Sequence, residues 1–207
     1  MHKGKSFLAP PRLFKGERAL YFPNFYGQTL EKDGKLRDTT SVLEGKVSVV
    51  SVFSSQWAEN QANTFVEEGV NQELSEIVRG SGGTAQMVRI NIEDNALKAW
   101  LVKAFMGGLR KKLGESNWGK YFLVRNEITT EIRDAVGLLN SKVGYTYLLD
   151  GECKIRWAGS GPAEGDERDG LTKGVRRLLD EARTKKPRAP VMPAPETVQE
   201  KDATAVV

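Results

Sequence analysis

The segment Val47–Phe53 reads VSVVSVF and is followed directly by SSQW at residues 54–57. A nearly continuous run of β-branched and apolar residues is typical of a strand that is buried on both faces of a sheet. The two serine hydroxyls can cap a helix, and residues 57–74 carry apolar side chains at helical spacing. The stretch therefore predicts a central strand, a short loop and a helix.

A second unit of the same kind follows along the chain. Residues 86–92 (QMVRINI) alternate between apolar and polar as a second strand, and Asn91 or Asp94 can cap a helix over residues 96–105. A glycine pair at residues 107–108 ends that helix, with three cations just after its C-terminal end, where they complement the helix dipole. The two units together predict two parallel strands.

Shorter elements complete the pattern. An Asp-Gly turn at residues 150–151 separates two strands, which is a strong hairpin signal. The expected elements are hairpin strands over residues 145–149 and 153–158, a short strand over residues 121–124, a connecting helix or loop over residues 128–139, a closing helix over residues 166–183, and an N-terminal hairpin that pairs residues 19–22 with residues 36–39 around Asp33 and Gly34.

The order of these elements indicates a fold class. Two parallel strand-helix units, an insertion, an antiparallel hairpin and a final helix predict an α/β protein with a mixed central sheet flanked by helices. This is the thioredoxin-like arrangement, and the N-terminal hairpin is that of its peroxiredoxin-type variant. We expect residues 1–18 to form a basic extended arm and residues 19–184 to form the domain. Residues 185–207, with four of the eight prolines, should be a disordered Pro-rich tail.

The chain contains one cysteine, Cys153, and one histidine, His2. These counts exclude an intramolecular disulfide framework, a CxxC pair and a cysteine-based zinc cluster. They also disfavour a Ser-His-Asp triad or a multi-histidine metal site, because His2 lies beside the first residue. We therefore expect no catalytic residue, no metal ligands and no cofactor.

The end of the central strand is the place where a thioredoxin carries its redox CxxC. Here that place holds Ser54, Ser55, Gln56 and Trp57. A serine hydroxyl cannot replace a low-pKa thiolate in disulfide exchange, so we expect a redox-inactive domain. Two interpretations are open for these four residues: a helix cap with a packed tryptophan, or a retained peptide-binding groove that serves as a client-binding loop.

Cys153 falls just after the hairpin turn, away from that loop. Because no histidine or second cysteine accompanies it, a partly buried structural thiol is favoured over a nucleophile. The alternative is a thiol-dependent, thioredoxin-like reductase or peroxidase that acts through Cys153.

The net charge of +4 is too small to indicate nucleic-acid binding, and we expect none. Its placement is more informative, because the arm holds one acidic residue, Glu17, and several cations. These cations are Lys3, Lys5, Arg12, Lys15 and Arg18. Such an arm suits an acidic partner or an anionic membrane, where each cation is worth about 1 kcal/mol. A solvated arm with no partner is the alternative.

Four strings carry a resemblance to a known family. They are HKGKSFLAPPRLF (residues 2–14), ALYFPN (19–24), VVSVFSSQWAENQ (49–61) and YTYLLDGECKIRWAGSG (145–161). Through them the chain resembles the fungal mitochondrial ATP synthase assembly factor family, the chaperones of subunit a (subunit 6) of the membrane Fo sector. The resemblance runs from the arm through the closing helix and leaves out the proline-rich tail.

The resemblance implies a non-catalytic protein held peripherally on the matrix side of the mitochondrial inner membrane. It implies that the protein binds newly made subunit a and helps it to join the ring of subunit c. The basic arm adds the anionic inner-membrane surface as an expected partner. Members of that family usually begin with a longer segment that carries the import presequence, so we expect this sequence to lack that segment.

Overall fold

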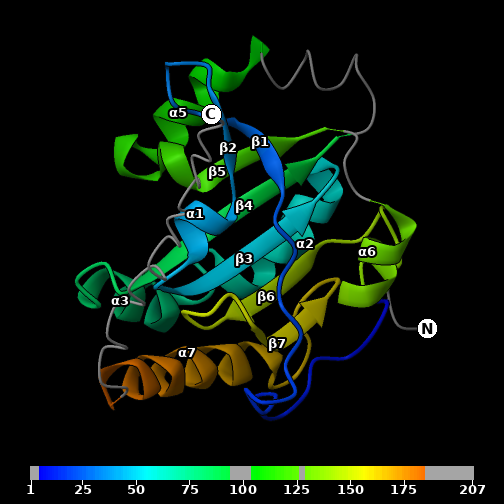
Figure 1. The fold of residues 1–207 in the computed structure, drawn as a ribbon, viewed down its shortest axis with the longest axis vertical. Coiled ribbons are helices and arrows are strands. Elements are labelled where there is room, and N and C mark those ends of the chain that lie inside the picture. Colours follow the sequence, from blue (N-terminus) through cyan, green and yellow to red (C-terminus); the bar gives the residue numbers. More distant parts are fainter. Residues whose placement is uncertain (1–4, 94–103, 126–128, 185–207) are drawn as a thin grey trace, which may run out of the picture.

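The computed structural model describes residues 5–93, 104–125 and 129–184 (Figure 1). Its centre is strand β3 (Val47–Phe53), in which every residue is buried. The strand pairs in parallel with β4 (Ala85–Ile92) and antiparallel with β6 (Tyr145–Leu149). A strand with neighbours on both edges and helices on both faces has no polar side, which explains its apolar sequence.

The sheet has seven strands in the order β2-β1-β5-β4-β3-β6-β7. Strand β5 (Tyr121–Val124) is parallel to β4, and β7 (Ile155–Ser160) forms the predicted hairpin with β6. Strands β1 (Tyr26–Thr29) and β2 (Leu36–Asp38) add an antiparallel hairpin beside β5. The sheet is therefore mixed, as the sequence predicts.

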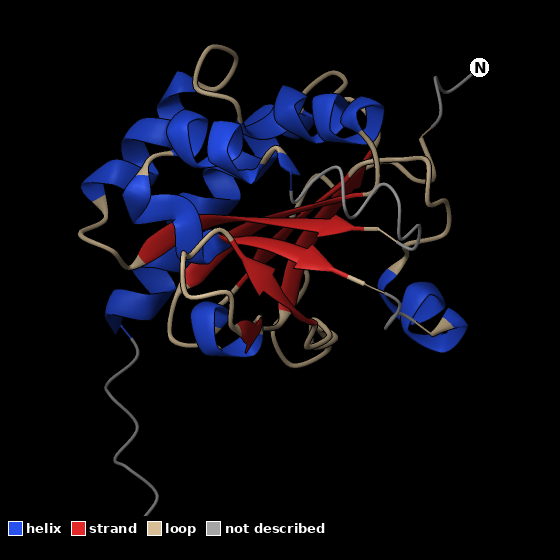
Figure 2. Cartoon of the chain, turned by 90° about the horizontal axis from the view of Figure 1, so that it is seen from above, coloured by secondary structure: helices blue, strands red, loops and turns tan. Residues whose placement is uncertain are grey.

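Helices cover both faces of the sheet (Figure 2). One face carries α2 (Gln56–Val66), α3 (Gln72–Gly80) and α7 (Glu167–Thr184), whose apolar side chains pack around the buried rings of Phe65 and Trp157. The opposite face carries α1 (Thr40–Leu43) and α6 (Thr130–Val136) over a larger apolar cluster.

A third, smaller apolar cluster lies beside β1 and β5. Helix α5 (Met106–Leu113) and the short helix η1 (Glu115–Lys120) supply part of it. They pack against Leu30, Phe53 and Tyr121, so this corner is joined to the end of the central strand.

The predicted helix over residues 57–74 is wrong in its length, because two helices occupy that region. Helix α2 ends at Val66, and Asn71 caps α3 by accepting a hydrogen bond of 3.2 Å from the Leu74 amide. The Asn71 amide also donates to the Phe65 carbonyl at 2.9 Å and to the Thr172 hydroxyl at 3.1 Å. The break is thus fixed by a buried contact with a distant helix.

Two further predictions need correction. The glycine pair at residues 107–108 lies inside α5 and does not end a helix, while the expected helix over residues 96–105 falls almost entirely outside the described residues. The N-terminal hairpin exists, but its first strand is β1 and not residues 19–22. In that earlier stretch, Tyr21 makes an isolated bridge to Lys154.

The N-terminal strap, residues 5–22, runs along β7 at one edge of the sheet. Its backbone is bound there by hydrogen bonds from the Phe14 amide to the Arg156 carbonyl (2.7 Å) and from the Phe22 amide to the Cys153 carbonyl (2.8 Å). In the described part of the chain, no helix is long and apolar enough to cross a bilayer.

Candidate functional site

The candidate site lies where β3 ends and α2 begins. Ser55 is the N-cap of α2, and its hydroxyl accepts a hydrogen bond of 3.1 Å from the Ala58 amide. Gln56 donates to Glu59 and Asn60 at 3.2 and 3.1 Å along the same helix. The predicted helix cap is therefore confirmed.

Trp57 does not pack into the core, which corrects the interpretation of a packed tryptophan. It points outward from the first turn of α2 with 54% of its surface exposed. More than half of the surface of this side chain therefore stays in contact with water unless a partner covers it.

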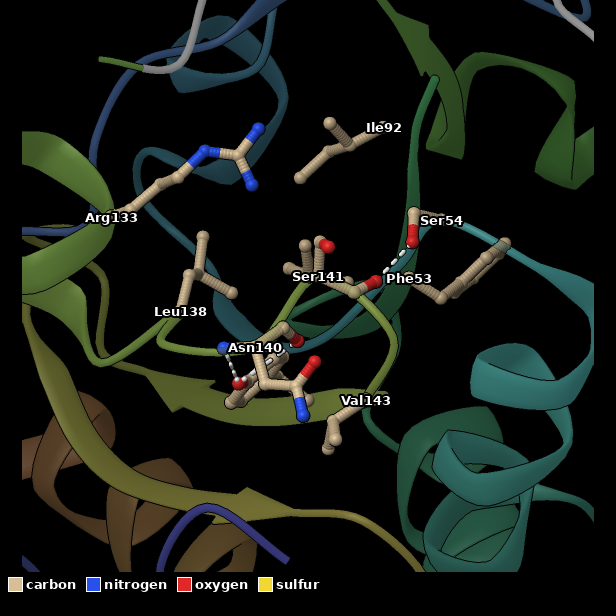
Figure 3. Close-up of a pocket in the computed structure, with 10 residues that line it drawn as sticks. Phe53, Ser54, Ile92, Arg133, Leu138, Asn140, Ser141 and Val143 are labelled. Carbon is tan, nitrogen blue, oxygen red and sulfur yellow. Dashed lines mark hydrogen bonds between the residues drawn. The ribbon is translucent and has the colours of Figure 1, made fainter. Parts of the chain in front are cut away.

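Ser54 closes one side of the site. Its hydroxyl donates to the carbonyl of Ser141 in the loop before β6, and the small cavity behind this link measures about 30 Å³ (Figure 3). Arg133 extends from α6 along the other side of that cavity. A space of this size holds water but no peptide or cofactor.

The loop before β6 is held tightly against α2. The Gly144 amide donates to the side-chain oxygen of Gln61 at 2.9 Å, in a buried position. A Cβ atom at Gly144 would lie 2.1 Å from the Ala58 carbonyl oxygen, so only glycine permits this approach. The start of α2 is therefore fixed on this side.

The open side of the site is a groove of about 440 Å³ between α2, the end of β4 and the start of α5. Its walls are Phe53, Ser54, Ser55, Gln56, Glu59, Asn91, Glu93, Phe105, Leu109 and Tyr121. Phe105 stands at its rim with 68% of its surface exposed. A volume of this size falls in the range of small-ligand and peptide side-chain pockets.

Two polar groups of the groove, those of Tyr121 and Glu59, have partners within the domain. Burial raises the pKa of Tyr121 to about 12, although the Asn91 amide donates to its hydroxyl at 3.1 Å. Glu59 pairs with Arg89 at 3.2 Å. The phenol stays neutral near pH 7, and among the described residues no cluster of three or more metal-ligating side chains is found.

Cys153 lies far from this groove, at the other end of β3. The turn that holds it is bound to the segment just before that strand, because the Gly45 amide donates to the Gly151 carbonyl at 2.9 Å. A strand of this length spans roughly 20 Å. Burial, with the nearby carboxylates of Glu44 and Asp150, raises the pKa of the Cys153 thiol. A protonated, buried thiol is a poor nucleophile, which argues against the reductase or peroxidase alternative.

The basic arm is only partly available for binding. The Lys5 ammonium is buried, forms an ion pair of 2.7 Å with Glu167 and donates to the Ser160 carbonyl at 2.9 Å. It therefore presents no charge to a surface, contrary to the expectation for the arm. Arg12, Lys15 and Arg18 are exposed, whereas Lys3 lies outside the described residues.

Sequence reasoning missed the other wall of the groove. Glu93 follows β4 as Ser54 follows β3, and the carboxyl ends of parallel strands meet at one edge of a sheet. The sequence could therefore have placed Glu93 beside Ser54. No local sequence pattern predicts that Phe105 and Tyr121 line the groove, because their place in its wall depends on how α5 packs against the sheet.

The fold and the site together define a thioredoxin-like domain without the dithiol pair of the redox enzymes. A secreted thiol-disulfide isomerase of Corynebacterium glutamicum has a similar fold, with a TM-score of 0.55, 12% identity, and coverage of 87% of this chain and 96% of that one. A DsbF homologue of Corynebacterium diphtheriae gives a TM-score of 0.50 at 12% identity, with coverage of 87% and 97%. At this identity the similarity concerns the fold alone.

The chain belongs to the ATP10 protein family, whose model matches residues 1–178. It is 35% identical over 181 residues to the mitochondrial ATPase complex subunit ATP10 of Candida glabrata, and this covers 86% of the chain and 64% of that relative. The corresponding protein of Saccharomyces cerevisiae is 27% identical over 187 residues, covering 85% of the chain and 66% of the relative. The chain thus spans somewhat less than two thirds of the length of the Candida relative.

Proposed function

We propose that the protein is a non-catalytic assembly factor of the mitochondrial ATP synthase, which binds newly made subunit a of the Fo sector and promotes its assembly with the ring of subunit c. The observation that carries this proposal is the family match, which covers residues 1–178 and so includes the whole described domain up to the last turns of α7. Relatives that are 27% and 35% identical are named mitochondrial ATPase complex subunits.

The geometry of the site supports binding over catalysis. At the position of a redox dithiol the chain has a serine cap and a serine bound to a backbone carbonyl. Beside them lies an open groove lined in part by the exposed ring of Phe105, and the exposed ring of Trp57 stands on the same first turn of α2 as Gln56, which lines the groove. Exposed aromatic side chains beside a groove suit an apolar segment of a membrane protein before it is assembled.

We assign the client-binding surface to Ser54, Ser55, Gln56 and Trp57 together with Phe105 on the facing wall. Binding to the rings would bury the exposed parts of both side chains, and full burial of one large apolar side chain is worth about 1.5–3 kcal/mol. The two rings are therefore expected to supply a large share of the affinity for the client. The protein would act at the matrix side of the inner membrane as a peripheral protein.

Immunoprecipitation of the tagged protein from mitochondria whose own translation products are pulse-labelled tests the proposal. Labelled subunit a should be recovered directly after the pulse and should disappear from the precipitate during a chase into mature ATP synthase. Recovery of no translation product would contradict the proposed client.

Variants locate the surface in the same assay. Trp57→Ser combined with Phe105→Ser should lose subunit a from the precipitate. The matched control is Leu36→Ser combined with Val70→Ser, two exposed apolar side chains away from the groove. Equal loss of subunit a from the precipitate in both double variants would contradict the groove as the client-binding surface.

A further inference from the structure

The N-terminal strap presents an exposed patch that contains both apolar and cationic side chains. We define the strap patch as Arg12, Phe14, Lys15, Arg18, Leu20 and Tyr21, all of which are exposed. The exposed fractions are 42% for Phe14, 60% for Leu20 and 65% for Tyr21. Three of the ten large apolar side chains that stand exposed in the described chain thus fall within eight residues.

The backbone fixes these side chains close together. Phe14 is bound to Arg156 of β7, and the Leu20 carbonyl accepts from the Ile155 amide at 2.8 Å. Between them the chain leaves the strand and returns through a turn closed by the Arg18 amide, which donates to the Lys15 carbonyl at 3.0 Å. Lys15 and Arg18 are therefore carried on a turn whose two ends bear Phe14 and Leu20, and Arg12 lies just before that turn.

The strap is anchored firmly enough to act as a surface and not as a loose arm. The Lys5 ion pair holds its start, and the buried Trp157 indole donates to the Pro10 carbonyl at 3.0 Å. The Arg156 guanidinium donates to the Phe14 carbonyl at 2.9 Å. Ordering the patch on binding therefore costs little, since it is already held in place.

We propose that the strap patch docks the protein on an anionic lipid bilayer, with the Phe14 and Leu20 side chains in the interface and the cations of the turn at the headgroups. This rests on the peripheral membrane location proposed above. The three patch cations have no ion pair among the described residues, and Glu17 is the one acidic residue within residues 12–21. Apolar and cationic groups on one short segment match the apolar and anionic layers of such an interface.

Co-sedimentation of the full chain with phosphatidylcholine vesicles, with and without phosphatidylserine, tests the proposal. The chain should bind far better when phosphatidylserine is present. Lys15→Gln combined with Arg18→Gln should weaken that binding roughly 30-fold at low salt, from about 1 kcal/mol for each cation. Leu20→Ser should weaken it roughly tenfold by removing apolar burial.

Matched controls separate docking from a general effect of charge or apolar surface. Lys111→Gln combined with Lys112→Gln removes two exposed cations of α5, which packs against the other half of the sheet, and should leave vesicle binding unchanged. Leu36→Ser, at a leucine with 53% exposure on β2, is the apolar control. Thermal unfolding should not move in any of these variants, because exposed side chains change stability by less than about 0.5 kcal/mol.

Several results would overturn the proposal. These are absence of vesicle binding, equal binding with and without phosphatidylserine, or equal losses in the strap variants and their controls. Binding to poly-glutamate but not to vesicles would also overturn it, in favour of an acidic protein partner. Failure on vesicles while subunit a is still recovered from mitochondria would overturn the docking surface alone and leave the proposed client in place.

Discussion

Replacing Lys5 with methionine tests how the strap is held to the domain. The Lys5 side chain has 1% exposure and the Glu167 side chain has 9%, so the substitution leaves a buried charge without its partner. Such a loss costs about 3–5 kcal/mol. The lower end is expected here, about 3 kcal/mol, because the amides of Ala9 and Glu164 still donate to the carboxylate, which also lies at the N-terminus of α7.

The assay is urea and thermal unfolding followed by circular dichroism. About 3 kcal/mol corresponds to a fall in Tm of about 6–12 °C for a chain of this size. Lys15→Met is the control, since Lys15 is an exposed cation on the same strap and should change stability by less than about 0.5 kcal/mol. Combining Lys5→Met with Glu167→Gln should recover part of the loss. Equal stability of Lys5→Met and Lys15→Met would refute the buried ion pair.

Further predictions concern the site and the thiol. Gly144→Ala should destabilise the domain by about 3 kcal/mol in urea unfolding, because its methyl would meet the Ala58 carbonyl oxygen at 2.1 Å, and an unchanged midpoint would contradict the close packing. Ser55→Ala should cost about 1 kcal/mol through loss of the helix cap, and a neutral result would show that the cap bond contributes little. Cys153→Ala should leave the recovery of subunit a unchanged, since the thiol is buried and its pKa is raised, whereas loss of recovery would revive a thiol-dependent activity. Tyr121 has a pKa raised to about 12, so its stabilising contribution is fully present below about pH 10 and is lost as the pH rises toward 12. Tyr121→Phe should therefore flatten the fall in unfolding free energy over that range by up to about 1.4 kcal/mol per pH unit, and an unchanged slope would contradict the burial of the phenol.

The central part of the fold follows from local sequence. The apolar run of Val47–Phe53 predicts a buried strand, and the Asp-Gly turn predicts the β6–β7 hairpin, because both signals depend on adjacent residues. The expected chain order also predicts the mixed sheet. Local patterns carry this information since burial on both faces and tight turns each impose their own residue types.

The features that were missed depend on contacts between distant residues. The break between α2 and α3 rests on Asn71 and Thr172, which are 101 positions apart. The pairing of Lys5 with Glu167 joins residues 162 positions apart and turns a cation of the arm into an anchor. Neither contact produces a periodic pattern in the sequence. A single polar residue gives the same local pattern whether it lies on the surface or in a buried pair.

The outward position of Trp57 shows the same limit at the site. A tryptophan in the first turn of a helix after a buried strand reads as part of the core, since most tryptophans are largely buried. In the structure the first turn of α2 is packed through Ala58, which leaves the tryptophan on the outer side. The choice between a packed ring and an open groove needed the three-dimensional arrangement of α2 and α5.

Site-specific photocrosslinking from position 57 tests the central claim most directly. A benzoylphenylalanine placed at Trp57 in the tagged protein, illuminated in mitochondria during a pulse of their own translation, should form an adduct with labelled subunit a that fades during the chase. The same probe placed at Leu36, an exposed residue on β2 away from the groove, should form none. Absence of an adduct from position 57, or an equal adduct from position 36, would contradict the groove as the client-binding surface.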